Sequence, residues 1–444
     1  MNFSRRRMLQ AGAAGATLLA AAPVSAASNG ELRRWATTYS GIDIEQQEPG
    51  LPGEHYEPVT TPNGSTLPFR VVDGVKVFHL IAEEVEHEFA PGLSAHCWGY
   101  NGRVHGPTIE AVEGDRVRIY VSNRLPEPTT VHWHGVFLPC GMDGVGGLTQ
   151  PVIPPGETWV YEWIFRQHGT LSYHAHHDEM TQMAMGLMGM IVVHPRRPSE
   201  ADRVDRDFAL LLSEWKIRPG TRRPDPNAMS DFNVLTFNAR CYPGTEPLLA
   251  RRGDRVRIRF ANLSAMDHHP IHLHGHWFRL TETDGGPIPL AAQYPDSTLL
   301  VPAGTTRTIE FIADNPGDWA MHCHMTHHVM NQMGHDIPNM LGVDADVVKA
   351  ALRPTGVSLP VFGDKGMDVH GLHVESGHMP VPENSIPMVG KRGPYDYITM
   401  GGMFTILKVR ADIGDGSDPG WYDMPDGSRS RRANRGELER DGVK

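Results

Sequence analysis

The stretch EGDRVRIYVSN, residues 113–123, recurs almost unchanged as RGDRVRIRFAN, residues 252–262. Apolar and polar residues alternate along the first copy, and a Gly-Asp pair near the start of both copies is typical of a turn that opens a strand. Chance explains one shared segment easily, so the blocks that follow each copy decide whether a β domain is duplicated.

Further blocks follow each copy in the same order. VHWHG, residues 131–135, matches IHLHG, residues 271–275, and residues 154–177 match residues 302–325. The offset is 140 residues from His132 to His272 and 148 residues from His174 to His322, which a small insertion explains. Ordered blocks of this kind indicate two copies of one domain.

The composition favours short strands joined by turns, because the 444 residues include 36 Pro and 47 Gly and no long stretch has helical periodicity. We predict an all-β protein made of two β-sandwich domains, residues 65–197 and 205–345, with an irregular lead-in over residues 28–64. Residues 346–444 are predicted to form an irregular, partly disordered C-terminal extension. Within it, residues 397–410 read as a strand that docks onto a domain.

The N-terminus reads as a targeting segment. Twin arginines in SRRRMLQ precede a short Ala-rich apolar run and a small-residue cleavage site, so residues 1–27 resemble a Tat signal peptide. We therefore expect a periplasmic or secreted protein with no membrane span after cleavage. The net charge of −11 argues against nucleic acid as a partner.

Histidines recur in pairs with one residue between them. Alternate residues of a strand face the same side, so each His-x-His pair directs two imidazoles to one point. Chance explains one such pair easily, but not four at matching places in two repeats. These pairs are predicted metal ligands, namely His132 with His134, His174 with His176, His272 with His274, and His322 with His324.

The stretch MHCHMTHHVMNQM, residues 321–333, adds a second kind of site. Cys323 points away from the face shared by His322 and His324, so its thiolate can bind a different metal. With His269, His328 and Met333 it provides the Cys, two His and weak axial Met of a blue-copper electron-transfer site. The first repeat cannot form this site, because it has Ala175 where the second has Cys323.

Taken together, HWHG, HAH, HPIHLHG and HCHMTHHVMNQM resemble the four copper-binding motifs of multicopper oxidases over about 280 residues. The resemblance implies cupredoxin-like Greek-key sandwiches and four coppers per functional unit. Type 2 copper would bind His132 and His272, and the two type 3 coppers His134, His174, His176, His274, His322 and His324. Type 1 copper would bind His269, Cys323, His328 and Met333.

The spacing is similar to that of the two-domain, small laccase-like members. Three-domain members insert a whole domain between the second and third motifs, whereas here only 95 residues separate His176 from His272. In the two-domain group the three-copper cluster lies between domain one of one subunit and domain two of the next, so we expect a homotrimer.

The resemblance also implies a carboxylate that supplies protons to the cluster. Asp143 matches the acid expected near the first motif, although a plain Asp-Gly turn is an alternative interpretation. The other usual acid position holds Val329, and Asp178 or Glu179 could replace it. Cys97, Cys140 and Cys241 leave room for at most one disulfide within the chain.

The predicted function is a laccase-like oxidase that couples one-electron oxidation of phenols or aromatic amines to four-electron reduction of dioxygen to water. An alternative in the same class is a metallo-oxidase that acts on Cu(I) or Mn(II). A third alternative, a non-catalytic copper-sequestering protein, would need neither paired His-x-His units in two domains nor a His-Cys-His segment.

Overall fold

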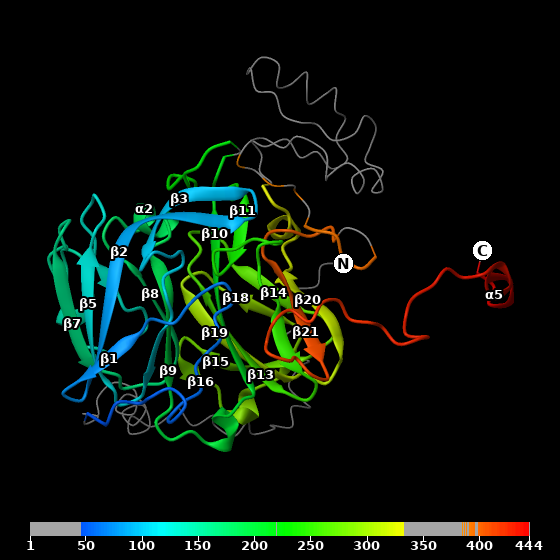
Figure 1. The fold of residues 1–444 in the computed structure, drawn as a ribbon, viewed down its shortest axis with the longest axis horizontal. Coiled ribbons are helices and arrows are strands. Elements are labelled where there is room, and N and C mark those ends of the chain that lie inside the picture. The colour runs from blue at the N-terminus through cyan, green and yellow to red at the C-terminus, as the bar shows by residue number, and fades with distance from the viewer. Residues whose placement is uncertain are drawn as a thin grey trace, which may run out of the picture. The chain divides into compact units, whose positions relative to one another are not determined.

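The computed structural model describes residues 46–218, 220–332, 384, 386, 388, 390–395 and 398–443. Helices in these ranges are short, and strands make up most of the regular structure (Figure 1). The helical segments are η1 (Cys140–Met142), α2 (Glu179–Ala184), η2 (Glu200–Asp202), η3 (Leu290–Ala292), η4 (Thr326–Val329) and α5 (Arg435–Arg440). No helix in the described ranges is long and apolar enough to cross a membrane. The predicted signal peptide and Met333 lie outside them.

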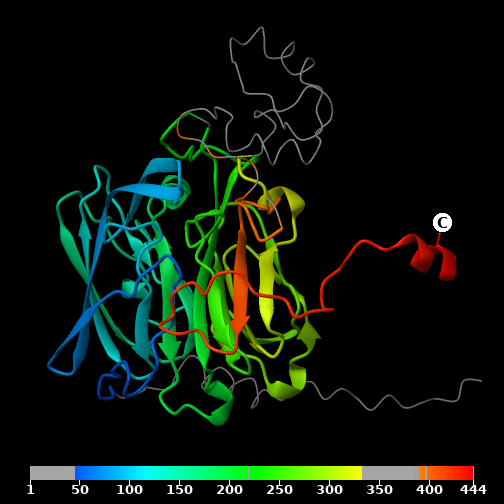
Figure 2. The ribbon, with the colours of Figure 1, turned by 45° about the vertical axis from the view of Figure 1, so that its right-hand side comes forward.

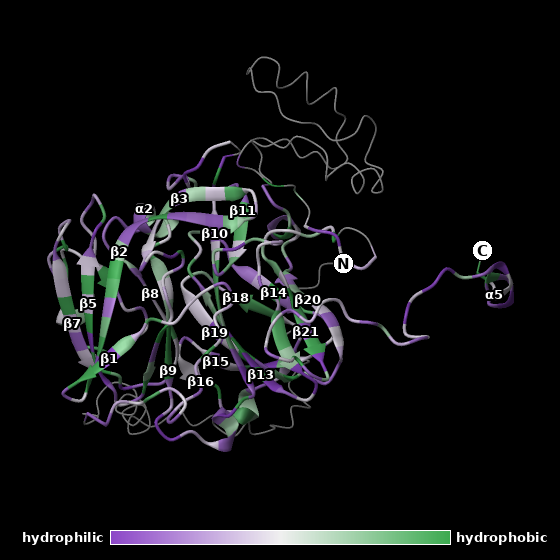
Figure 3. Ribbon diagram, in the orientation of Figure 1, coloured by the Kyte–Doolittle hydropathy of each residue, from purple (hydrophilic) through white to green (hydrophobic). Residues whose placement is uncertain are grey.

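The first sandwich contains two sheets. One has the order β1-β2-β5-β7, with β3 paired to β2, and the other has the order β4-β9-β8-β6. Their strands are β1 (Phe69–Val72), β2 (Val75–Ala90), β3 (Leu93–Tyr100), β4 (Ile109–Val112), β5 (Arg116–Asn123), β6 (Val131–His132), β7 (Thr158–Ile164), β8 (Gly169–Ala175) and β9 (Met188–His194). Polar and apolar residues alternate along much of β5, as the purple and green of Figure 3 show, and its aliphatic residues Val117, Ile119 and Val121 are buried.

The second sandwich repeats this plan. One sheet has the order β11-β10-β13-β19-β15-β16, with β17 paired to β15, and the other has the order β12-β21-β20-β14-β18. Its strands are β10 (Arg206–Trp215), β11 (Val234–Phe237), β12 (Leu248–Arg251), β13 (Arg255–Asn262), β14 (His269–Leu273), β15 (Phe278–Thr283), β16 (Gly286–Pro287), β17 (Pro295–Asp296), β18 (Thr298–Val301), β19 (Thr305–Ile312), β20 (Gly317–Cys323) and β21 (Phe404–Arg410). The predicted all-β fold with two sandwiches is confirmed.

Strand β21 comes from the region for which the sequence predicted the C-terminal extension. It pairs antiparallel with β20 and parallel with β12, so it lies inside a five-stranded sheet. Figure 1 and Figure 2 show β21, in orange, beside the yellow β20. In the first sandwich β9 has the same place, antiparallel to β8 and parallel to β4. The second sandwich is therefore completed by residues far beyond residue 345.

Each sandwich has its own buried core, around Trp133 in the first and Phe260 in the second. A further apolar cluster joins the two, because Phe89 of β2 packs edge-on against Trp215 of β10 with ring centroids 5.0 Å apart. Polar contacts add to this junction, including the Thr170 hydroxyl, which donates to Glu282 at 2.9 Å. All four cysteines carry free thiols, and no disulfide forms between them.

Candidate metal centres

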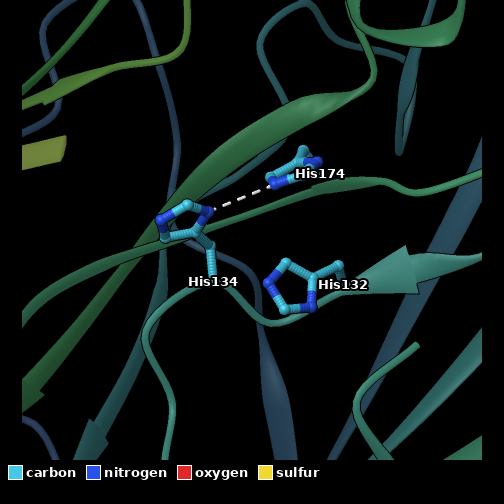
Figure 4. A group of neighbouring side chains, drawn as sticks. All are labelled: His132, His134 and His174. Atoms are coloured by element: carbon cyan, nitrogen blue, oxygen red, sulfur yellow. Dashed lines mark hydrogen bonds between the residues drawn. The ribbon is translucent and has the colours of Figure 1, made fainter. Parts of the chain in front are cut away.

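The first group of four histidines lies where β6 meets β8. Antiparallel pairing places His132 directly opposite His174, and each pair places its second imidazole two residues further on the same face. His134 Nδ1 lies 3.3 Å from His174 Nε2 (Figure 4). The ring centroids of His132 and His176 are 5.4 Å apart. We call His132, His134, His174 and His176 the first quartet.

The second group repeats the arrangement on β14 and β20. His272 lies opposite His322 in the register, and His274 Nε2 lies 3.2 Å from His322 Nε2. The ring centroids of His272 and His324 are 5.5 Å apart, close to the corresponding spacing in the first quartet. We call His272, His274, His322 and His324 the second quartet. The same cross-strand pairing in both sandwiches shows that the sequence repeat is also a repeat of the site.

Backbone carbonyls fix the orientation of several of these rings. A ring whose Nδ1–H donates to a carbonyl keeps its Nε2 lone pair available for a metal. Four rings have a carbonyl oxygen within 2.7–2.9 Å of Nδ1, namely His132 with Asp143, His174 with Ala175, His272 with Ser297, and His322 with Cys323. Burial lowers the pKa of His174 to about 3, so this imidazole is neutral near pH 7. Both quartets thus have the neutral, oriented nitrogens that a metal ion requires.

A separate three-residue site lies behind the second quartet. His269 Nδ1 is 3.2 Å from His328 Nδ1, and the Cys323 sulfur is 3.7 Å and 3.4 Å from these two atoms. A trigonal ion with metal–nitrogen distances of about 2.0 Å and a metal–sulfur distance of about 2.3 Å would separate its ligand atoms by roughly 3.5 Å. The observed triangle therefore fits a metal ion without rearrangement. Burial raises the pKa of the Cys323 thiol to about 12, so metal binding here would displace a proton.

Two carboxyl groups beside this site were not anticipated from the sequence. The Asp267 carboxylate lies 3.4 Å from His328 Nε2, and Glu214 accepts hydrogen bonds from the backbone N–H groups of Met266 and Asp267. Burial, and next the charge of Asp267, raise the pKa of Glu214 to about 8. Asp267 stands two residues before His269, a signal that could have identified it, whereas Glu214 on β10 is distant in sequence.

Acidic side chains also border the first quartet. The Asp143 carboxylate lies 3.5 Å from His132 Nδ1. The backbone carbonyl of Asp143 contacts the same nitrogen. Glu179 begins α2 and lies 3.7 Å from His174 Nδ1 and 3.6 Å from His176 Nε2. Asp178, the alternative weighed with Glu179, is the residue just before α2.

The two quartets do not meet within one chain. Among the described residues, every ring contact and hydrogen bond between quartet histidines joins members of the same quartet. His272 lines an open cavity of about 840 Å³, together with Trp277 and Leu290. Trp277 is 75% exposed and Leu290 71%, which is unusual for side chains of this size beside a polar site.

Comparison with known proteins finds matches to one protein family. Two family models described as multicopper oxidase match residues 82–198 and 218–340. Copper resistance protein A of Escherichia coli is 30% identical over 234 residues, which cover 42% of this chain and 38% of that protein. Dihydrogeodin oxidase of Aspergillus terreus is 29% identical over 343 residues, which cover 68% and 52%. The chain thus spans about half or less of the length of these curated relatives.

Solved structures match over more of their length. The blue copper oxidase from Nitrosomonas europaea aligns with a TM-score of 0.56 and 25% identity, covering 75% of this chain and 85% of that one. The multicopper oxidase mgLAC aligns with a TM-score of 0.57 and 27% identity, covering 80% and 91%.

Proposed function

The chain belongs to the multicopper oxidase family, in its two-domain form, and on that premise we propose that it is an exported oxidase coupling one-electron oxidation of phenols or aromatic amines to four-electron reduction of dioxygen to water. The observation that carries this proposal is the place of Cys323 between His322 and His324. Its thiol belongs to the three-residue site, while both neighbours belong to the second quartet. Copper ions bound at these sites would supply the electron storage that the protein alone lacks.

The described residues that we propose as type 1 ligands are His269, Cys323 and His328. Met333 is the proposed axial ligand and lies outside the described residues. We propose that the eight quartet histidines hold one type 2 and two type 3 coppers. Cys323 lies on the covalent backbone between the two sites, so its strand connects electron entry to the oxygen-reducing cluster.

Oxygen reduction consumes protons, and the chain offers two acids to supply them. We propose that the Asp143 carboxyl holds a proton beside His132, and that the Glu179 carboxyl does so beside His174 and His176. Glu179 would thus fill the role left open by Val329.

We further propose a homotrimer in which the first quartet of one subunit faces the second quartet of the next. Support comes from the separation of the quartets within one chain and from the exposed apolar side chains beside them. Leu148, 81% exposed, lies in the loop that follows Asp143, and Trp277 lines the cavity beside His272. Apolar rims around two half-sites suit a head-to-tail contact that closes into a ring.

One measurement tests the trimer. The substitution Trp277→Glu should lower the native mass to that of one chain and abolish oxygen uptake, while the blue colour of the type 1 site remains. Val72→Glu, at a 45%-exposed position on β1, is the matched control and should leave the assembly intact. A wild-type protein that is active as a monomer would contradict the intersubunit cluster.

The main experiment compares copper-loaded and copper-depleted protein. We expect four coppers per chain, a blue absorption band, and oxygen uptake that depends on an added phenol. Copper binding without oxygen uptake with any reductant would refute the oxidase and favour copper sequestration.

A second candidate function, oxidation of a metal ion such as Cu(I) or Mn(II), has its own support. The Asp267 carboxylate lies 3.4 Å from His328 Nε2, where it would attract a cation. The substitution Asp267→Asn should then raise the KM for Mn(II) at least tenfold and leave that for a neutral phenol unchanged. Equal effects on both substrates would exclude a cation-specific role.

A further inference from the structure

His269 of the three-residue site has one nitrogen that faces away from the proposed metal. Its Nδ1 is the atom that approaches the Cys323 sulfur and His328, whereas its Nε2 lies 2.7 Å from the hydroxyl oxygen of Ser264. Ser264 stands in the short loop between β13 and β14. Both residues are buried, His269 completely and Ser264 with 6% of its surface exposed. Water therefore has little access to replace this contact.

The buried side chain of Asn262 fixes the contact from both sides. Its carbonyl oxygen accepts a hydrogen bond from the backbone N–H of Ser264 at 2.9 Å, and its amide nitrogen donates to the carbonyl of Val301 at 2.9 Å. Val301 is the register partner of His269 on the neighbouring strand β18. One amide group thus holds the serine and the strand opposite the histidine together, which keeps the hydroxyl beside the ring.

The first sandwich contains the same turn without the hydroxyl. The side chain of Asn123 accepts a hydrogen bond from the backbone N–H of Leu125 at 2.9 Å and donates to the carbonyl of Ile153 at 2.9 Å. Ile153 pairs with Thr129, which stands where the second repeat has His269. Leu125 is 2% exposed, so the turn forms with a buried apolar side chain at this position. The turn itself does not require a serine, and the serine occurs in the copy that has the histidine.

An acceptor at Nε2 determines which nitrogen of His269 can bind a metal. A neutral imidazole carries one hydrogen, and the nitrogen without it offers the lone pair. When Nε2–H donates to the Ser264 hydroxyl, the lone pair belongs to Nδ1, 3.7 Å from the Cys323 sulfur. A hydrogen bond of this kind also makes the imidazole a more basic ligand.

We propose that Ser264 is a positioning residue for the type 1 copper, whose hydroxyl accepts a hydrogen bond from the Nε2–H of His269 and so keeps Nδ1 available to the metal. This inference rests on the proposed function, which assigns His269, Cys323 and His328 to that copper. The oxidised ion has the higher charge and gains more from an electron-rich ligand than the reduced ion does. The hydrogen bond should therefore lower the reduction potential of the site.

The substitutions Ser264→Thr and Ser264→Val test the proposal in copper-loaded protein, because they have similar shapes and differ in the hydroxyl. Ser264→Val should weaken copper binding at the type 1 site by roughly 10–100-fold, measured from the blue band in competition with a chelator. Redox titration of the same band should give a higher reduction potential. A tenfold loss confined to the oxidised ion corresponds to a rise of about 59 mV. Ser264→Thr should keep the affinity and the potential of the wild type.

Two further variants complete the test. Ser264→Ala removes the hydroxyl without adding bulk and carries the same expectation as Ser264→Val. The matched control is Ser122→Ala, because the Ser122 hydroxyl also lies 2.7 Å from a histidine Nε2, that of His79 in the first sandwich. This control should leave the copper affinity and the potential of the type 1 site unchanged.

Wild-type affinity and potential in Ser264→Ala would overturn the proposal, as would equal shifts in Ser264→Thr and Ser264→Val. A lower melting temperature of the copper-free variant at an unchanged potential would show a purely structural role and would overturn it too. A wild-type protein without a blue band would refute the type 1 site itself, and this inference with it. A blue wild type with unresponsive variants would refute the role of Ser264 alone.

Discussion

Two buried histidines make the acid stability of the two-sandwich unit predictable. His87 of β2 has its Nε2 2.7 Å from the carbonyl oxygen of Ala239, and His105 has its Nε2 2.8 Å from the Ser213 hydroxyl. Both contacts join the first sandwich to the second. Burial lowers the pKa of His87 to about 4 and that of His105 to about 3.

The sign of the effect follows from linkage. Between these values and the unfolded pKa of about 6.5, the unfolded chain binds more protons than the folded one, so stability is complete above pH 6.5 and falls as the pH falls. At pH 5 each histidine costs about 2 kcal/mol relative to neutral pH, and the pair about 4 kcal/mol. With about 2 °C per kcal/mol for a large domain, the melting temperature should fall by roughly 8 °C through these two groups.

The assay compares melting temperatures at pH 7.5 and pH 5 for the wild type and for the double variant His87→Gln with His105→Gln. Between the two pH values, the melting temperature of the double variant should fall by roughly 8 °C less than that of the wild type. This difference is expected even if altered packing makes the variant less stable at both pH values. His96→Gln, at an exposed position on β3, is the control and should behave as the wild type. An equally steep loss in the double variant would refute the assignment of acid lability to these buried rings.

Three further substitutions test the site and the core. Cys323→Ser should abolish the blue colour and turnover but leave most of the cluster copper bound, as metal analysis and absorption spectra would show; a persistent blue band would contradict the type 1 assignment. Glu179→Gln should lower oxygen uptake by roughly a hundredfold at unchanged copper content if its carboxyl supplies protons, and unchanged turnover would remove that role. Lys76→Met removes one of the two cations that pair with the fully buried carboxylate of Asp115 and leaves Arg196 as the other, so unfolding experiments should show a loss of about 3 kcal/mol; a loss below about 1 kcal/mol would show that Arg196 and the backbone N–H groups of Gly50 and Val112 compensate.

The grouping of the histidines could be predicted because it depends on local rules. A His-x-His pair on a strand fixes two rings on one face, and the repeat places two such strands side by side in each sandwich. The same alternation of side chains along a strand predicts that Cys323 faces the opposite side from His322 and His324. The carboxyl groups near His328 were harder to predict from the sequence. Asp267 contacts His328, and its backbone N–H donates to Glu214, which lies on a strand more than a hundred residues earlier in the chain than His328.

The strand that closes the second sandwich could not be located in the same way. Residues 176–187 join β8 to β9 in the first sandwich, whereas residues 324–403 join β20 to the equivalent strand β21 in the second. Hydrophobic alternation predicts that Phe404–Arg410 is a strand but carries no information about its partner. The partner is set by the gap left between β12 and β20, which only the three-dimensional structure shows.

Burial holds β21 in the second sandwich. Phe404, Leu407 and Val409 are each at most 3% exposed, and each contributes about 1.5–3 kcal/mol. The connection ends beside the proposed electron-entry site, because Met403, just before β21, donates its backbone N–H to the carbonyl of His328 at 3.0 Å. A segment added at this point can therefore change the surroundings of the copper ligands while the sandwich that supports them stays the same.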